Sequence, residues 1–261
     1  MPAQRVYVYG IIHVEAGEDV PSAPPGLAGD PVRAVAGDGL AALVSTTRPS
    51  FEDELKDAER ARSLILDHHR VLQQLFANRT VLPMRFGALF ADDEKVRGAL
   101  LEYRQDLVEA LARVQGASEW GVKIFCDRSV LRGHLGGGSA ARLAAQGEFA
   151  AATQGRAFFL QRRIARLADE EVEGAVARAV EESRRHLCAA ARADTAMKFQ
   201  PAAVHMRADD MVANDAYLVA DGALFFALID ELRQLHGPRG FHIETNGPWP
   251  PFSFADCKLG E

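Results

Sequence analysis

The sequence predicts an α+β protein of two domains, residues 1–117 and 118–261, the second of them ferredoxin-like. Short runs of β-branched and aromatic residues, which are typical of strands, are mixed with longer stretches whose apolar residues recur at helical spacing. Gly116-Ala117-Ser118 interrupts this pattern and marks the expected boundary. Beyond it, the predicted order is strand, helix, strand, strand, helix, strand, which is the order of the split βαβ fold.

The first domain begins with a strand over residues 6–12, whose unbroken apolar run indicates burial on both faces. The prolines and glycines of residues 15–31 predict a loop. The runs 32–36 and 40–45 flank Gly37-Asp38-Gly39. They predict a hairpin, because Asp-Gly supplies the positive φ angles of a tight turn.

Helices follow this hairpin. Acidic residues open a helical region over residues 51–78, and its apolar stripe includes His68. Residues 81–90 return to extended structure, with Pro83 at an edge or bend because proline has no N–H to donate. A further helix is predicted over residues 92–114.

In the second domain, the pattern predicts helices over residues 154–192 and 224–235, and strands over residues 119–126, 196–207, 212–220 and 241–245. An unbroken helix over 154–192 would be about 58 Å long, so we expect a bend near Gly174. The Gly-Gly-Gly-Ser run at 136–139 indicates a flexible linker, and the alanine-rich residues after it, to 153, show no clear pattern.

Residues 247–254 hold three prolines within four residues, which argue against a helix or a strand ladder and predict polyproline II. Two interpretations stay open. Either the aromatic side chains pack on the C-terminal domain, with Trp249 mostly buried, or a groove on a partner captures the segment. The first is favoured, because no flanking charge would keep the aromatic residues in solvent.

Composition narrows the function. The 261 residues carry a net charge of −6, which argues against general nucleic-acid binding and against binding to anionic membranes. The apolar run near the N-terminus is too short to span a bilayer and no signal-peptide pattern is visible, so we expect a cytoplasmic protein. The three cysteines are scattered and form no C-x-x-C, which fits reduced, buried thiols.

No motif assembles a catalytic centre, and neither a cofactor nor a metal is predicted. Adjacent His68 and His69 point about 100° apart on a helix and cannot share a ligand face, so His68 should lie at the core edge and His69 in solvent. The glycine run 136–138 lacks the lysine of a phosphate-binding loop. Asp92-Asp93 and Asp209-Asp210 are interpreted as cap and turn residues.

Arg85 lies in an extended segment between apolar residues. An arginine there should find a carboxylate or carbonyl partner, because an unpaired buried charge is costly. We therefore expect Arg85 and Phe86 to serve the fold and the contact between domains more than partner binding.

Four segments resemble those of one family, in the same order and over nearly the whole chain. They are Tyr7-Val8-Tyr9-Gly10-Ile11, Val81-Leu82-Pro83-Met84-Arg85-Phe86-Gly87, Glu119-Trp120-Gly121-Val122-Lys123 and Gly247-Pro248-Trp249-Pro250-Pro251-Phe252-Ser253-Phe254. On these segments the sequence resembles the gas vesicle GvpL/GvpF family. The motif residues, with structural or partner-binding roles, are Pro83, Arg85, Phe86, Gly87, Trp120, Gly121, Pro248, Trp249, Pro250, Pro251 and Phe252.

The resemblance implies a non-enzymatic accessory protein of gas vesicle assembly that binds the hydrophobic shell protein and other accessory proteins. It also implies two α+β domains, the second ferredoxin-like, and it transfers no catalytic residue. Two alternatives stay open. One is a minor structural component of the vesicle shell, and the other is an enzyme on a ferredoxin-like fold, since fold alone does not determine function.

Overall fold

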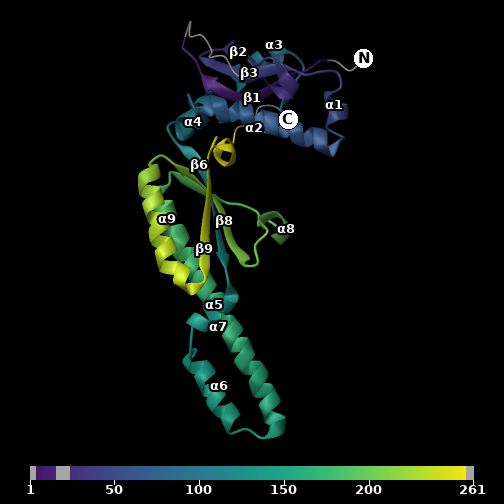
Figure 1. The fold of residues 1–261 in the computed structure, drawn as a ribbon. Coiled ribbons are helices and arrows are strands. Elements are labelled where there is room, and N and C mark those ends of the chain that lie inside the picture. Colours follow the sequence, from purple (N-terminus) through teal and green to yellow (C-terminus); the bar gives the residue numbers. More distant parts are fainter. Residues whose placement is uncertain (1–3, 16–23, 257–261) are drawn as a thin grey trace. The chain divides into compact units, whose positions relative to one another are not determined.

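The structure is a computed structural model that describes residues 4–15 and 24–256 (Figure 1). It combines helices with antiparallel sheets, as predicted for an α+β protein. The chain divides into two compact units. The first contains the residues up to Glu119 and those from Pro248 onward, and the second contains Trp120–Gly247.

The first unit is built on a sheet with the strand order β2-β3-β1-β4, in which β5 also pairs with β1. Its strands are β1 (Val6–His13), β2 (Arg33–Gly37), β3 (Leu40–Thr46), β4 (Leu82–Pro83) and β5 (Leu89–Phe90). β1 pairs antiparallel with β3 along one edge and with β4 and β5 along the other, and it has a bulge between Val8 and Gly10. The predicted first strand and hairpin are confirmed.

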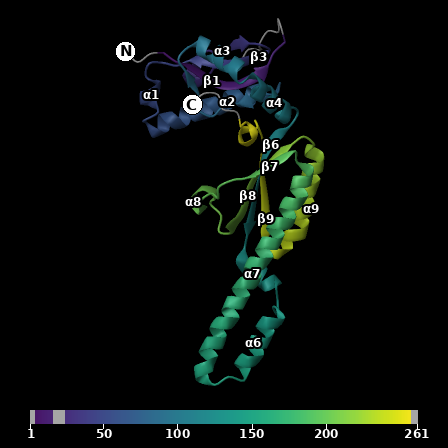
Figure 2. The ribbon, with the colours of Figure 1, turned by 180° about the vertical axis from the view of Figure 1, so that it is seen from behind.

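The helices of this unit are α1 (Phe51–Glu54), α2 (Ala58–Phe76), α3 (Asp93–Glu102) and α4 (Arg104–Val114). Asp57 and Asp92 cap α2 and α3 by accepting the N–H of the third residue that follows. The single helix expected over 92–114 is wrong, because Tyr103 leaves helical geometry at φ −100° and ψ 15°. α2 and α3 cover opposite faces of the sheet (Figures 1 and 2).

The core of the first unit lies where β1 and β3 meet α2. Every residue of β1 from Val6 to Ile12 is buried, which confirms the predicted burial on both faces. The side chains of Tyr7, Tyr9, Leu43, Val71 and Leu72 are fully or almost fully excluded from water. Burial of this apolar area, at about 25 cal/mol per Å², is the main stabilising contribution in the unit.

The second unit carries a sheet with the strand order β7-β8-β6-β9. Its strands are β6 (Ser118–Cys126), β7 (Ala193–Ala196), β8 (Asp210–Val219) and β9 (Phe241–Trp249). Its helices are α5 (Arg128–His134), α6 (Ala140–Ala150), α7 (Gln154–Ala190), α8 (Ala202–His205) and α9 (Gly222–His236). Apolar residues of α7 and α9 join Val122, Ile124 and Phe241 of the sheet in one core.

The bend expected near Gly174 is wrong, because α7 runs as one helix of 37 residues. That is about 55 Å. The length is possible because only the C-terminal half, from Val172 to Leu187, packs in the core with the sheet. The N-terminal half extends beyond the sheet and lies beside α6 (Figures 1 and 2).

The residues expected to be a linker and an unpatterned stretch form an ordered turn and α6. Gly136 and Gly138 take φ angles of 57° and 86°, which favour glycine. Ser139 caps α6, and Arg142 pairs with Glu171 of α7 at 3.2 Å in a largely buried site. α6 and the N-terminal half of α7 therefore form a helical hairpin, residues 139–171.

The strand expected over 196–207 is also wrong beyond its first residue. β7 ends at Ala196, and Pro201, which lacks an N–H, precedes the short helix α8. The segment then covers Phe125, with the His205 ring centroid at 5.1 Å and the Arg207 guanidinium 4.7 Å above the ring. Because Phe125 alternates with Ile124 and Cys126 of the core, this is the sheet face away from α7 and α9.

Gly10 should not tolerate a side chain. A Cβ there would lie 2.8 Å from Val81 Cγ2 and 2.9 Å from the Leu82 carbonyl oxygen. Gly10→Ala should therefore reduce the free energy of unfolding by about 1–3 kcal/mol. Gly98→Ala, at an exposed site of α3 with open space around it, should instead raise it by about 0.5–1 kcal/mol. Chemical denaturation measures both, and equal effects would contradict this account.

Candidate interaction site

The motif turn Pro83–Gly87 is held from inside by two hydrogen bonds. The Met84 carbonyl accepts a hydrogen bond from His68 Nε2 at 3.1 Å, and the Gly87 N–H donates to the Tyr7 hydroxyl at 3.3 Å. Gly87 has φ 95°, a conformation that glycine adopts without strain. The turn after β4 is thus attached to the core of the first unit.

The tautomer of His68 follows from its partners. A carbonyl oxygen only accepts, so Nε2 carries the proton, and Nδ1 accepts from the Tyr7 hydroxyl at 2.8 Å. Burial, with a smaller contribution from His69, lowers the pKa of His68 to about 4. His68 is therefore neutral at pH 7. It is buried inside the core, on the apolar face where it was expected, rather than at the edge of the core.

The tail of the chain docks on the first unit. β9 continues through Pro248 to Trp249, and residues Phe252–Phe254 form a 3-10 turn. The Phe252 ring lies 4.9 Å from the ring of His69, which is half-buried rather than in solvent, and Phe254 is buried. The expected polyproline segment is wrong, because a strand runs to Trp249 and a 3-10 turn follows at Phe252. The expected packing on the C-terminal domain is wrong as well, because the residues from Pro248 belong to the first unit.

Glu119 fastens this tail. Its carboxylate accepts the Ser253 N–H at 2.7 Å and the Ser253 hydroxyl at 2.8 Å. Burial raises the pKa of Glu119, and the two hydrogen bonds from Ser253 act against that rise. The residues are 134 positions apart, so no local pattern in the sequence could pair them.

Two motif residues expected to be inside lie outside. The Arg85 side chain is 96% exposed and its nearest carboxylate, on Asp256, is 3.9 Å away. The inward positions of the turn are taken by buried Met84 and by Phe86, 5.8 Å from the His68 ring. Trp249, at the end of β9 beyond buried Phe241 and Ile243, is 37% exposed. The expected burial of Arg85 and Trp249 is therefore wrong.

Trp120 and Gly121 belong to the second unit and are not part of this site. The Trp120 ring contacts Phe226 of α9 edge-on at 4.6 Å. A Cβ on Gly121 would come within 2.5 Å of Asn246 Oδ1, so a larger residue there would make the Asn246 side chain of β9 move. The third motif thus divides, with Glu119 serving the tail and its next two residues serving the second sheet.

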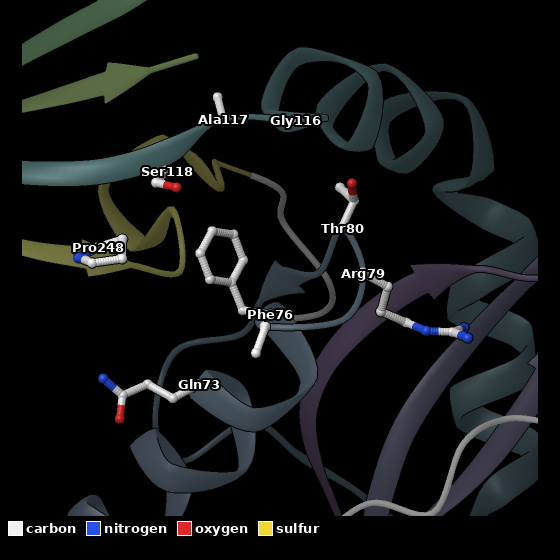
Figure 3. A pocket seen from close by; sticks show the side chains of 9 residues that line it. Gln73, Phe76, Arg79, Thr80, Gly116, Ala117, Ser118 and Pro248 are labelled. Atoms are coloured by element: carbon white, nitrogen blue, oxygen red, sulfur yellow. The ribbon is translucent and has the colours of Figure 1, made fainter. Parts of the chain in front are cut away.

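A shallow groove of about 480 Å³ lies beside the tail, lined by Gln73, Phe76, Ala77, Arg79, Thr80, Gly116, Ala117, Ser118 and Pro248. Figure 3 shows the Phe76 ring pointing into it and the Arg79 guanidinium pointing away. Among the described residues, those that line the groove carry no carboxylate, imidazole or thiol.

The structure also bears on the metal, membrane and thiol features considered in the sequence. In residues 4–15 and 24–256, no group of three or more His, Cys, Asp or Glu side chains could hold a metal ion. Within the same ranges, no helix has the length and apolar character needed to cross a membrane. Burial raises the pKa of the Cys126 and Cys188 thiols to about 11, so both stay protonated near neutral pH. Cys257 lies outside the described residues.

The lowered pKa of His68 predicts loss of stability in acid. The unfolded chain takes up a proton near pH 6.5 and the folded one only near pH 4, so stability falls as the pH drops through this window. The loss is on the order of 3 kcal/mol at most. His68→Leu should lower stability at pH 7, since Tyr7 and Met84 lose a partner, but should flatten the acid loss in denaturant titrations. His13→Asn, at an exposed position, should keep the wild-type slope, and an unchanged slope in His68→Leu would contradict the assignment.

The link between Glu119 and Ser253 predicts a local change in the tail. Glu119→Gln places an NH₂ donor where one of two acceptor oxygens now lies. Amides of residues 252–256 should then exchange with deuterium about tenfold faster, equivalent to about 1.4 kcal/mol. Glu59→Gln, on the exposed face of α2, should leave this exchange unchanged. Equal rates in both variants would show that Glu119 does not hold the tail.

Comparison with known proteins places the chain in a family. The family model for the gas vesicle synthesis protein GvpL/GvpF matches residues 5–256. Gas vesicle protein F of Streptomyces sp. (strain CB03234) is 32% identical over 270 residues, which span 96% of this chain and 99% of the relative. Gas vesicle protein L of the same strain is 28% identical and spans 95% of this chain and 92% of its own length.

Solved structures have the same fold. The crystal structure of gas vesicle protein GvpF from Anabaena sp. PCC7120 has a TM-score of 0.70 at 23% identity and covers 98% of both chains. That of GvpF from Microcystis aeruginosa has a TM-score of 0.68 at 23% identity and covers 97% of this chain and 99% of that chain. With a family match that extends from Arg5 to Asp256, this protein belongs to the GvpL/GvpF family of gas vesicle synthesis proteins and has its role in gas vesicle formation.

Proposed function

We propose that this protein is a non-enzymatic accessory protein of gas vesicle assembly that binds the hydrophobic shell protein and other accessory proteins. The observation that carries the proposal is the family match over residues 5–256. We infer that the protein works from the cytoplasm at the growing vesicle, without a cofactor or nucleic acid.

The physical need for such a protein follows from the shell. A subunit that forms a wall facing gas exposes apolar surface before assembly, and exposed apolar surface aggregates unless it is covered. A chain with a net charge of −6 stays soluble while it covers such a surface. The accessory protein would bind transiently, because the covered surface must finally pack against other shell subunits.

We infer that the surface around the Pro83–Gly87 turn contributes to partner binding. The turn is rigidly attached to Tyr7 and His68, yet it presents Arg85 almost entirely to solvent. The Asp256 contact at 3.9 Å between two exposed side chains contributes little to stability. A rigid turn with an exposed charge suits recognition, whereas Pro83, Phe86, Gly87, Pro250, Pro251 and Phe252 serve to hold the turn and tail in place.

A ferredoxin-like classification of the second unit is part of the proposal. The chain order β6-α7-β7-β8-α9-β9 with the sheet order β7-β8-β6-β9 supports it, with α5 and α6 inserted after the first strand. The fold gives no argument for an enzyme, because ferredoxin-like domains serve many functions. In this protein, the sheet of the second unit supports the long helix α7.

A minor structural component of the shell is the second candidate. The apolar side chains that the second unit exposes favour it, since a component that stays in the wall needs apolar contacts. A wash of isolated vesicles separates the two: a shell component stays with the vesicles, and an accessory protein is removed.

Deletion of the gene in a vesicle-forming host tests the function. Vesicles should be absent or malformed by electron microscopy, and expression of the wild-type chain should restore them. A shell protein fused to a solubility tag should co-purify with the wild-type chain. It should also aggregate more slowly in the presence of that chain, as measured by light scattering. Normal vesicles in the deletion strain, with no paralogue present, would refute the assembly role.

Arg85→Ala provides the matching surface test. Because the side chain is exposed, the melting temperature should stay within about 1 °C of wild type. Binding to partner proteins of the vesicle should weaken several-fold. Arg113→Ala, at an exposed position of α4, is the control. A lower melting temperature with unchanged binding would return Arg85 to a structural role.

A further inference from the structure

The helical hairpin of the second unit exposes aromatic side chains at its outer end. Phe149 is the residue before the last of α6, and Phe158 and Phe159 lie in the first turns of α7. Phe158 is 59% exposed and Phe159 is 72% exposed, while Leu160, the next residue, is buried. We call residues 149–166 the hairpin tip.

Packing of the hairpin does not need these rings. α6 and α7 bury Ala145, Leu160 and Ala168, and they are joined by the Arg142–Glu171 ion pair and the pair of Arg156 with Glu148. Phe158 and Phe159 contact each other edge-on at 5.9 Å, and the pair remains in solvent. Exposure of apolar aromatic surface to water is unfavourable, so a group of exposed aromatic residues at one end of an element indicates a contact surface.

The charge around these rings is mainly positive. Glu148, next to Phe149, pairs with Arg156 at 3.1 Å and with Arg163 at 4.0 Å, and Glu170 pairs with Arg166 at 3.5 Å. These exposed pairs contribute little to stability, so a partner carboxylate can replace them. From Phe149 to Ala168 the sequence contains four arginines and no carboxylate, in a chain whose net charge is −6. The arginines are Arg156, Arg162, Arg163 and Arg166, and all are exposed. Arg162 lies over the Phe158 ring at 5.9 Å, and Phe159, Arg163 and Arg166 follow one another at helical spacing. Aromatic and arginine side chains are the types that dominate binding energy at protein interfaces.

We propose that the hairpin tip is a docking surface for a partner protein that presents an apolar surface bordered by carboxylates. The proposal rests on the proposed function, in which this partner is the vesicle shell protein before assembly. The phenylalanines cover apolar area on the partner, and the arginines form ion pairs at its border. Because the tip lies at the end of a hairpin that extends away from the second sheet, it can enter a concave or flat surface without hindrance from that sheet (Figures 1 and 2).

Charge favours a protein over an anionic membrane as the occupant. Immediately after the tip, α7 carries Asp169, Glu170, Glu171 and Glu173, which an anionic bilayer would repel. A protein surface can present carboxylates only where the arginines lie. A second copy of this chain is the other possible occupant, and the experiment separates both from the proposed one.

Paired variants of the full-length protein test the tip. Phe158→Ser with Phe159→Ser should weaken binding to a solubly tagged shell protein by about tenfold or more. Arg162→Glu with Arg166→Glu should slow association and reduce its dependence on salt. The controls lie elsewhere in the second unit. Phe199→Ser removes a ring that is also 59% exposed, and Arg185→Gln removes an exposed arginine near the other end of α7, so both should bind as wild type.

The outcomes separate this inference from the proposed function. If wild type binds the shell protein and the tip variants bind equally well, or if the controls lose as much affinity, the tip assignment is overturned while the function stands. If wild type does not bind the shell protein, the proposed partner is wrong. Two synthetic helical peptides with the same apolar face, one bordered by Glu and one by Lys, then test the tip alone. Binding of only the Glu peptide, lost in the tip variants, supports it, and binding of neither overturns it.

Two further readouts address the other occupants. The first readout is binding to phosphatidylglycerol vesicles. If the wild type binds these vesicles but not the Glu peptide, and the tip variants bind neither, the proposal is overturned in favour of a membrane. A dimer in size-exclusion chromatography that the tip variants abolish would overturn it in favour of self-association. Far-UV circular dichroism should show the wild-type helix content in every variant, because each changed side chain is exposed.

Discussion

Two tyrosine hydroxyls on the strand β1, which is buried from Val6 to Ile12, determine how the first unit is organised. Burying a hydroxyl costs free energy unless it is hydrogen-bonded, so Tyr7 and Tyr9 on β1 need partners inside the core. Tyr7 bonds His68 of α2 and the Gly87 N–H, and Tyr9 bonds Ser45 of β3 and the Leu27 N–H. Each partner comes from a different part of the chain. The strand therefore fixes the turn after β4 and the loop before β2 together with the core.

The motif segments of the family acquire a common explanation from this arrangement. The first segment supplies the tyrosines, and the second supplies the turn attached to them. In the fourth segment, Phe252 packs on His69 of α2 and Ser253 donates a hydrogen bond to Glu119. Glu119 belongs to the third segment. Three of the four segments thus meet in one unit, and what they leave exposed is Arg85 rather than a pocket with catalytic groups.

The second unit distributes its apolar residues differently. The C-terminal half of α7 is used for the core, and its N-terminal half packs mainly beside α6. A two-helix hairpin buries one face of each helix and cannot cover the outer faces. Phenylalanines on those outer faces remain in solvent, bordered by arginines in an otherwise acidic chain. The position of the hairpin tip is a consequence of the length of α7.

The sequence by itself determined the elements whose signals are local. The apolar run of β1, the Asp-Gly hairpin and the helices α2, α7 and α9 follow from propensity and periodicity, and four segments were enough to identify the family. Tertiary structure decided what depends on distant partners. Arg85 is exposed because Met84 and Phe86 occupy the inward positions, α7 can stay unbroken because only its C-terminal half packs in the core with the sheet, and the tail packs on the first unit because Glu119 accepts Ser253 across 134 positions. Such contacts leave no local periodicity, because the free energy that selects them arises only once both partners are folded.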